Sequence, residues 1–325
     1  MQDNQFFFDN FSSYLTSPMV KDSGLDLSNA TIMEILSEYA NFRRTLNPMF
    51  DNCAIVRKIR QLQEEFHCTV MPPQITDIFY ANFIQWAHMR DNCYSSIKLY
   101  CNQLKSALVW SSFHGGKLSP TYSTFSVPRH FRSRVALSQD EISHIAHFNV
   151  FGLPIRPQYQ RTMEKVRDTF VLLCNLGQRH SDIRRIAPEH FSRGTFKIIQ
   201  QKTGNKAVVD IDRYSIIPKL THSLLEKYNY TCPYKGNLNN FNMYLHRLLR
   251  MIGEEFNDIV ITEVKTNGKV EHISHRKWEL CTSHTGRRSF ITYNIMRCPT
   301  EIEVRRCSGH SSSKTFERYI SMDED

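Results

Sequence analysis

The chain of 325 residues is longer than one compact core usually accommodates, so its length predicts two domains. Hydrophobic residues make up 41% and charged residues 22%, which is typical of globular proteins and excludes a wholly disordered chain. Lys and Arg together exceed Asp and Glu by nine. This excess favours a polyanionic partner, because each neutralised phosphate releases a condensed counterion, although a basic protein without such a partner would have the same composition.

Two further exclusions concern membranes and secretion. No stretch approaches the roughly 18 continuous apolar residues that span a bilayer, and the N-terminus lacks the basic segment and apolar run of a secretory signal. Nine cysteines are scattered without a C-x-x-C pair, and such an odd, dispersed count is typical of reduced thiols. We therefore expect a cytoplasmic protein with no membrane partner.

The first part of the chain is predicted to be an arm followed by a helical bundle. Residues 1–24 show no clear period and are interpreted as a loose arm. In residues 25–114, apolar side chains recur three and four positions apart in four runs, as at Ile32, Ile35 and Tyr39, and this spacing predicts four amphipathic helices. The predicted helices begin near Ser28, Asp51, Thr76 and Ser96.

Residues 115–136 are rich in Gly, Pro, Ser and Thr and become basic toward their end, which predicts an interdomain linker. Basic side chains in the linker and in the helices before it are candidates for contacting a DNA backbone. Solvated helix faces carry similar charges, so that alternative stays open. The candidates are Arg43, Arg44, Arg57, Lys58, Lys98, Lys105, Arg129, Arg132 and Arg134.

Residues 137–325 are predicted to form a second domain, mixed α/β in class. Ser138 and Glu141 have the spacing of a capping box that opens its first helix. A second helix is predicted over 159–176, and Gly177 is expected to end it. The protein as a whole is therefore expected to be mainly α, with one small sheet in the second domain.

That small sheet is predicted from a hairpin, which follows a short helix beginning at Ser181. Residues 194–211 alternate in polarity on either side of Thr203-Gly204-Asn205, a turn signal between two strands. The remaining segments have helical spacing. The predicted sheet is thus antiparallel.

Six residues that carry chemistry follow one another along the second domain. In chain order they are Arg179, Lys202, His284, Arg287, His310 and Tyr319. Arg179 comes just after a helix-breaking Gly, and Lys202, at the hairpin tip, lies 23 residues beyond it. His284 and Arg287 form an H-x-x-R pair, a Gly-His pair lies 23 residues after that Arg, and the Tyr comes nine residues later. Each residue alone is an ordinary packing or surface residue; the ordered set is specific.

The ordered set resembles the tyrosine recombinase (phage integrase) family, whose catalytic residues run Arg, Lys, His-x-x-Arg, His and Tyr. The resemblance covers the chain from about residue 138 to its end. It extends more weakly over the helical block, which looks like the four-helix, SAM-like core-binding domain of that family. It implies a site-specific DNA recombinase with a mixed α/β catalytic domain.

The resemblance also implies roles that suit transesterification at a phosphodiester. Tyr319 would be the nucleophile and would form a 3′-phosphotyrosine. Arg179 and Arg287 would hold the non-bridging oxygens, because a planar guanidinium matches two of them at once. Lys202 would protonate the departing 5′ oxygen, and His310 would bond the phosphate. His284 would assist proton transfer. This scheme needs no cofactor and no metal.

Two neighbouring residues have less certain assignments. Asp182 matches an acidic position of the family and is predicted to support the catalytic groups, although an N-cap for the short helix is an equal alternative. Arg288 points about 100° round the helix from Arg287 and is predicted to contact the DNA backbone or lie at the surface.

Other functions have weaker support in the sequence. The pattern His272, His275, Cys281 and His284 contains ligand types that zinc accepts, but its five-residue gap is short for a zinc finger. The QKTGNK segment lacks the leading Gly and final Ser or Thr of a phosphate-binding loop, so a nucleotide-driven motor is not supported. A non-catalytic DNA-binding protein or a type IB topoisomerase of related chemistry stays an alternative.

By resemblance, the partner is double-stranded DNA with an inverted-repeat core site. A homodimer would occupy one site and a homotetramer would form the synapse, with the two domains clamping the duplex. An integrase or excisionase of a mobile element is favoured over a DNA invertase or an Xer-like resolvase.

Overall fold

The computed structural model describes residues 26–122, 131–132, 135–266, 269–298 and 300–316. The chain forms two compact units, Met1–His130 and Phe131–Asp325, called here the N-terminal and C-terminal units. The predicted arm and three predicted functional residues, Arg129, Arg134 and Tyr319, lie outside the described residues. Within the part of the chain that is described, no helix is both long and apolar enough to cross a membrane.

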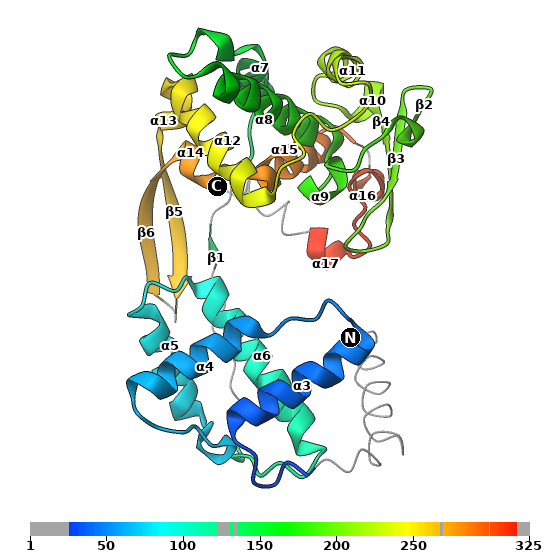
Figure 1. The fold of residues 1–325 in the computed structure, drawn as a ribbon. Helices are drawn as coiled ribbons and strands as arrows, with labels where there is room; N and C mark the ends of the chain where they lie inside the picture. The colour runs from blue at the N-terminus through cyan, green and yellow to red at the C-terminus, as the bar shows by residue number, and fades with distance from the viewer. Residues whose placement is uncertain (1–25, 123–130, 133–134, 267–268, 299, 317–325) are drawn as a thin grey trace. The chain divides into compact units, whose positions relative to one another are not determined.

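Residues 26–122 of the N-terminal unit form a bundle of four α-helices, as predicted (Figure 1). Its elements are α3 (Ile32–Leu46), α4 (Cys53–Glu65), the 3-10 turn η1 (Pro72–Gln74), α5 (Asp77–His88) and α6 (Tyr94–Ser112). The other three α-helices all pack against α6, and their apolar faces share one core that includes Ile35, Ile59, Phe83 and Leu104. Burial of these faces is what makes such short helices stable.

Two of the predicted helix starts in this unit are wrong by a few residues. The first helix is capped by Thr31 rather than Ser28: Thr31 Oγ1 accepts from the Glu34 backbone N–H, and Glu34 accepts from the Thr31 N–H at 2.7 Å. Ser28 instead bonds Asp26. The last helix has Cys93, not Ser96, at its N-cap. Several polar residues lie near each start, and only the packed backbone decides which one caps.

The C-terminal unit is larger and mixed. Its helical elements are α7 (Gln139–His147), η2 (Val150–Gly152), α8 (Pro157–Leu176), α9 (His180–Ile183), η3 (Pro188–His190), α10 (Ile211–Tyr214), α11 (Pro218–Lys227), α12 (Leu238–Ile252), α13 (Glu254–Asn257), α14 (Lys277–Leu280), α15 (Ser283–Ile295), α16 (Glu301–Ser308) and α17 (Ser313–Phe316). Its strands are β1 (Phe131–Arg132), β2 (Phe191–Ser192), β3 (Thr195–Ile199), β4 (Lys206–Asp210), β5 (Ile259–Thr266) and β6 (Lys269–Arg276).

Helix α8 is the centre of the C-terminal unit. It contacts α7, α11, α12 and α15, as Figure 1 shows, and its last nine residues are all buried. Sequence explains this position, because the run Phe170-Val171-Leu172-Leu173-Cys174 is apolar all round the helix and requires neighbours on every side. The predicted capping box at Ser138 and the predicted helix end at Gly177 are confirmed.

In the described residues of this unit there are two antiparallel three-stranded sheets, whereas the sequence predicted one. The predicted hairpin is β3–β4, with Ile199 opposite Lys206, and β2 extends its sheet. The second sheet, in the order β1-β5-β6, was not predicted. Its signal in the sequence is the Asn267-Gly268 pair between two alternating segments, a dipeptide typical of tight hairpins.

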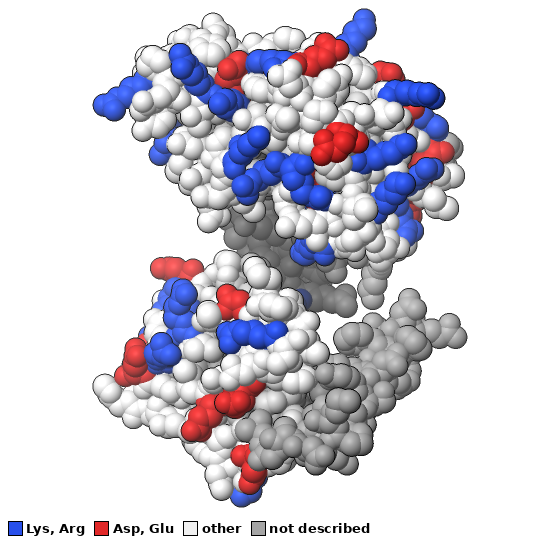
Figure 2. All heavy atoms as spheres, turned by 45° about the vertical axis from the view of Figure 1, so that its right-hand side comes forward, with Lys and Arg blue, Asp and Glu red and all other residues white. Residues whose placement is uncertain are grey.

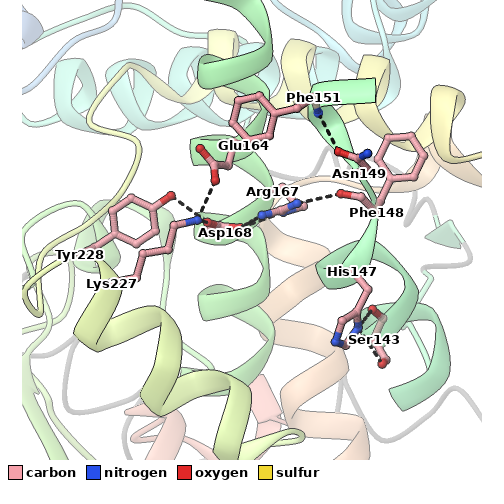
Figure 3. A network of polar contacts seen from close by, with 10 residues as sticks. All are labelled: Ser143, His147, Phe148, Asn149, Phe151, Glu164, Arg167, Asp168, Lys227 and Tyr228. Carbon is pink, nitrogen blue, oxygen red and sulfur yellow. Dashed lines mark hydrogen bonds and ion pairs between the residues drawn. The ribbon is translucent and has the colours of Figure 1, made fainter. Parts of the chain in front are cut away.

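A polar network fixes α8 to the helices around it (Figure 3). Asp168 of α8 is only 1% exposed and accepts from Arg167 Nε at 2.8 Å, Lys227 Nζ at 2.8 Å and the Tyr228 hydroxyl at 2.7 Å. Arg167 Nη1 donates to the Phe148 carbonyl, at 2.7 Å. The network therefore joins α8 to the end of α11 and to the segment after α7.

We expect Asp168→Ala to lower the free energy of unfolding by about 3 kcal/mol, because it leaves the partly buried Arg167 and Tyr228 without their shared acceptor. The measurement is urea unfolding followed by circular dichroism. Glu164→Ala is the matched control, since Glu164 bonds Lys227 at the rim of the same network and its loss should cost less than about 1 kcal/mol. Equal losses for the two variants would contradict this account.

Candidate active site

The site is built where the end of α8, the β3–β4 loop and the end of α16 meet α15. Gly177 ends α8 with φ +64°, in the left-handed region, and a Cβ at this position would overlap the Phe290 ring of α15. The chain can therefore turn sharply against α15. Arg179 follows at once, at the N-cap position of α9.

Arg287 is the most enclosed charged residue of the site, with a side chain that is 0% exposed. It lies on α15, and its Nη1 donates to the Gly177 carbonyl at 3.1 Å. Its Nη2 lies 3.0 Å from Nε2 and 3.2 Å from Nδ1 of His310. These contacts hold the guanidinium in one orientation before any ligand binds.

His310 follows the C-terminal Gly309 of α16 and faces Arg287. Its Nδ1 lies 2.8 Å from the Ser308 hydroxyl, and its ring packs edge-on against Phe316 at 5.5 Å between centroids. Burial, followed by the positive charges of Arg287 and Arg179, lowers the pKa of His310 to about 3. The ring is therefore neutral near pH 7 and serves as a hydrogen-bonding group.

Four of the six predicted catalytic side chains thus come together. Arg179, His284 and Arg287 all lie close enough to His310 to lower its pKa. Arg179 is half-buried, and His284 is exposed in the first turn of α15. Two arginines beside a neutral imidazole are a setting in which an anion can be held.

The structure places the fifth residue, Lys202, in the β3–β4 loop with its side chain exposed. No contact with the other four is described for it. Its loop is nevertheless fastened to the site, because Asn205 Nδ2 donates to the Gly309 carbonyl at 3.1 Å. Tyr319 lies outside the described residues, but Phe316, three positions earlier, is buried against His310.

Comparison with known proteins gives structural neighbours only: no family profile and no curated sequence matches this chain. Lambda integrase, as a dimer bound to a COC′ core site, superposes with a TM-score of 0.62 at 15% identity, over 90% of this chain and 96% of that one. The lambda integrase tetramer bound to a Holliday junction gives 0.61 at 16% identity, over 98% and 85%. Tn1549 transposon integrase in complex with transposon right end DNA gives 0.61 at 11% identity, over 89% and 94%.

The chain has the fold of the tyrosine recombinases. The match spans both units, so the predicted fold class is confirmed for the bundle and for the mixed domain. In this fold Arg179, Arg287 and His310 lie on elements that converge, so positions more than 100 residues apart in the sequence come close together.

Asp182 does not cap α9, which was the alternative to a supporting role. It is the third residue of α9 and is buried, and its Oδ1 accepts from the Gln201 backbone N–H at 2.9 Å and from Arg185 at 3.2 Å. It thereby fastens the helix after Arg179 to the loop that carries Lys202. The N-cap alternative is wrong, and the supporting role stays a prediction.

The prediction for Arg288 is wrong. It was expected at the surface or on DNA, but it is 6% exposed and its Nη1 donates to the Val135 carbonyl at 3.0 Å. Both flanks of α15 are covered in the recombinase fold, so a side chain a quarter-turn from Arg287 is still inside.

The predicted DNA-contacting residues of the N-terminal unit have mixed surroundings. Arg57 and Lys98 are exposed, and Arg44 is exposed and bonds Asn41. Arg43 lies over the Phe50 ring, 4.8 Å from its centroid. Lys58 and Lys105 are half-buried, and Arg132 belongs to β1 of the C-terminal unit. Figure 2 shows basic and acidic side chains interspersed on the visible face of the N-terminal unit, so solvation and DNA contact both fit these residues.

The zinc alternative gains no support from the site. Cys281 is fully buried, and burial raises the pKa of its thiol to about 12, whereas His284 is exposed. Among the residues that the structure describes, no three His, Cys, Asp or Glu side chains gather as metal ligands would.

Proposed function

We propose that the protein is a site-specific DNA recombinase, which cleaves and rejoins strands through a 3′-phosphotyrosine at Tyr319. The observation that carries the proposal is the convergence of Arg179, Arg287 and His310 beside His284, within the fold of the tyrosine recombinases. Two guanidinium groups and a neutral imidazole suit the five-coordinate, doubly charged phosphate of a transesterification.

The two arginines supply charge relief. Arg287 is oriented by a carbonyl and an imidazole, so little reorganisation is needed when charge builds on the non-bridging oxygens. Arg179, at the N-cap position of α9, holds the second non-bridging oxygen. Because this attraction grows as negative charge develops, it lowers the barrier more than it strengthens ground-state binding.

Each step of the reaction forms one P–O bond and breaks another. The Tyr319 oxygen attacks the phosphorus, the bond to the 5′ oxygen breaks, and Lys202 gives that oxygen its proton. The Tyr319 proton passes to a base, a role for which His284 is the candidate. A 5′ hydroxyl from a partner strand then attacks the phosphotyrosine and releases the enzyme, so no external energy source is consumed.

The biological role proposed is that of an integrase or excisionase of a mobile element, acting in the cytoplasm. The structural neighbours favour it, because they are a lambda and a transposon integrase seen with DNA. We propose the same kind of partner here: double-stranded DNA, with a homodimer on a core site and a homotetramer in synapsis. A DNA invertase or resolvase would use the same chemistry and differ only in the arrangement of its sites.

The test is covalent trapping. Wild-type protein and Tyr319→Phe are incubated with nicked duplexes tiled across the DNA that flanks the gene, and adducts are resolved under denaturing conditions. We expect an adduct with the wild type, none with Tyr319→Phe, and wild-type yield with the control Tyr159→Phe, an exposed tyrosine of α8. An adduct with Tyr319→Phe would refute this nucleophile. DNA binding without any adduct would favour the non-catalytic alternative.

A further inference from the structure

A buried glutamine occupies the junction of the site and was not singled out in the sequence. Gln200 follows β3, and it continues the buried face of Phe196 and Ile198 at alternate positions while being 1% exposed itself. A polar side chain on the apolar face of a strand is costly unless all its hydrogen bonds are made. That mismatch of pattern is the signal by which sequence reasoning could have found it.

Gln200 makes all the hydrogen bonds that its amide allows. Its Oε1 accepts from Arg179 Nη1 at 2.5 Å and from Thr203 Oγ1 at 3.1 Å. Its Nε2 donates to Gln178 Oε1 at 3.0 Å and to the Ser308 carbonyl at 2.8 Å. Two acceptor and two donor positions are thereby filled.

These four partners come from the three segments that carry catalytic candidates. Arg179 and Gln178 lie at the α8–α9 junction, Thr203 neighbours Lys202 in its loop, and Ser308 precedes the turn to His310. Gln178 extends the connection, since its Nε2 donates to the Leu176 and Cys307 carbonyls at 2.7 and 2.8 Å. One side chain therefore contacts all three segments of the site at once.

Packing at the α16 turn is adapted to this amide. Gly309 has φ +68°, and a Cβ there would lie 2.5 Å from the side-chain amide of Gln200. Only glycine permits so close an approach in this conformation. The turn before His310 therefore packs directly against the Gln200 side chain.

We propose that Gln200 is a positioning residue, which orients the Arg179 guanidinium and holds the Lys202 loop and the His310 turn in register for phosphoryl transfer. This role rests on the function proposed above. A neutral amide suits it for an electrostatic reason: its carbonyl fixes one Nη of Arg179 without cancelling the positive charge that the phosphate needs. A carboxylate at the same place would pair with the guanidinium and compete with the phosphate.

The experiment compares full-length Gln200→Met, which keeps the side-chain volume but loses the hydrogen bonds, with Gln200→Glu and with Gln201→Ala as the exposed neighbouring control. Single-turnover cleavage of the trapping duplex is measured under saturating protein, and DNA affinity by titration. We expect both Gln200 variants to cleave about 100-fold more slowly, as misplaced catalytic groups do, with DNA affinity within about threefold of the wild type. Gln201→Ala should cleave at the wild-type rate.

Chemically modified substrates distinguish a positioning role of Gln200 from a purely structural one. A methylphosphonate at the scissile position removes one charged oxygen and so reduces the need for Arg179. Sulfur in place of the bridging 5′ oxygen leaves without protonation and so bypasses Lys202. We expect at least one of these two modified substrates to reduce the difference in cleavage rate between Gln200→Met and wild type by about tenfold. This is the scale of one lost proton-transfer or charge contact.

The possible results distinguish failure of the positioning role from failure of the proposed function. Wild-type cleavage by Gln200→Met, or a defect that neither substrate narrows, would overturn the positioning role while leaving the proposed function intact. Absence of an adduct with wild-type protein on every duplex would overturn the proposed function and this role together.

Discussion

Arg287→Lys is expected to slow single-turnover DNA cleavage by about 1,000-fold, the upper range for losing one preorganised donor of this kind. Lysine keeps the charge but loses the planar fork that reaches the Gly177 carbonyl, the His310 ring and a phosphate at once. DNA affinity should change little, because a phosphate contact that strengthens in the transition state contributes mainly to the rate. The measurement is cleavage of the trapping duplex under saturating protein.

Arg306→Lys is the matched control, since Arg306 is an exposed arginine on α16, close in sequence to the site. It should cleave at the wild-type rate. Equal cleavage by Arg287→Lys and the wild type would show that the guanidinium geometry is not used in the reaction. Weakened DNA binding with an unchanged cleavage rate would assign Arg287 to affinity alone.

Gly177→Ala is expected to lower the free energy of unfolding of the C-terminal unit by about 3 kcal/mol. Two costs add: a side chain in the left-handed region costs about 1 kcal/mol, and overlap with the Phe290 ring costs about 2 kcal/mol more. Cleavage should fall as well, because the Gly177 carbonyl orients Arg287. Guanidinium chloride unfolding and the trapping assay measure the two effects.

Gly204→Ala isolates the backbone cost. Gly204 has φ +67°, but a Cβ there would meet no atom within 4 Å, so the expected loss is only about 1 kcal/mol. The difference between the two variants therefore reports the contact with Phe290. If both lose the same stability, α8 and α15 can separate enough to accept a methyl group, and the tight approach argued for the site would be refuted.

Local patterns in the sequence carried much of the fold. Periodic apolar residues located the four helices of the N-terminal unit, the same kind of spacing over 159–176 predicted α8, and Thr203-Gly204-Asn205 marked the β3–β4 hairpin. Helix starts were misplaced where several capping residues stand together, because the choice depends on which backbone N–H groups the packed helix leaves exposed. The β5–β6 hairpin was missed although Asn267-Gly268 signalled it.

The sequence by itself determined the types and order of the catalytic candidates, because their order and spacing resemble a family pattern and local signals show which elements carry them. Only the tertiary structure decided that Arg287 is enclosed, that His310 is neutral, that Arg288 is buried and that Gln200 joins three segments. Burial, electrostatic shifts and long-range hydrogen bonds depend on atoms that are distant along the chain. Periodicity and spacing describe only near neighbours, so they cannot contain that information.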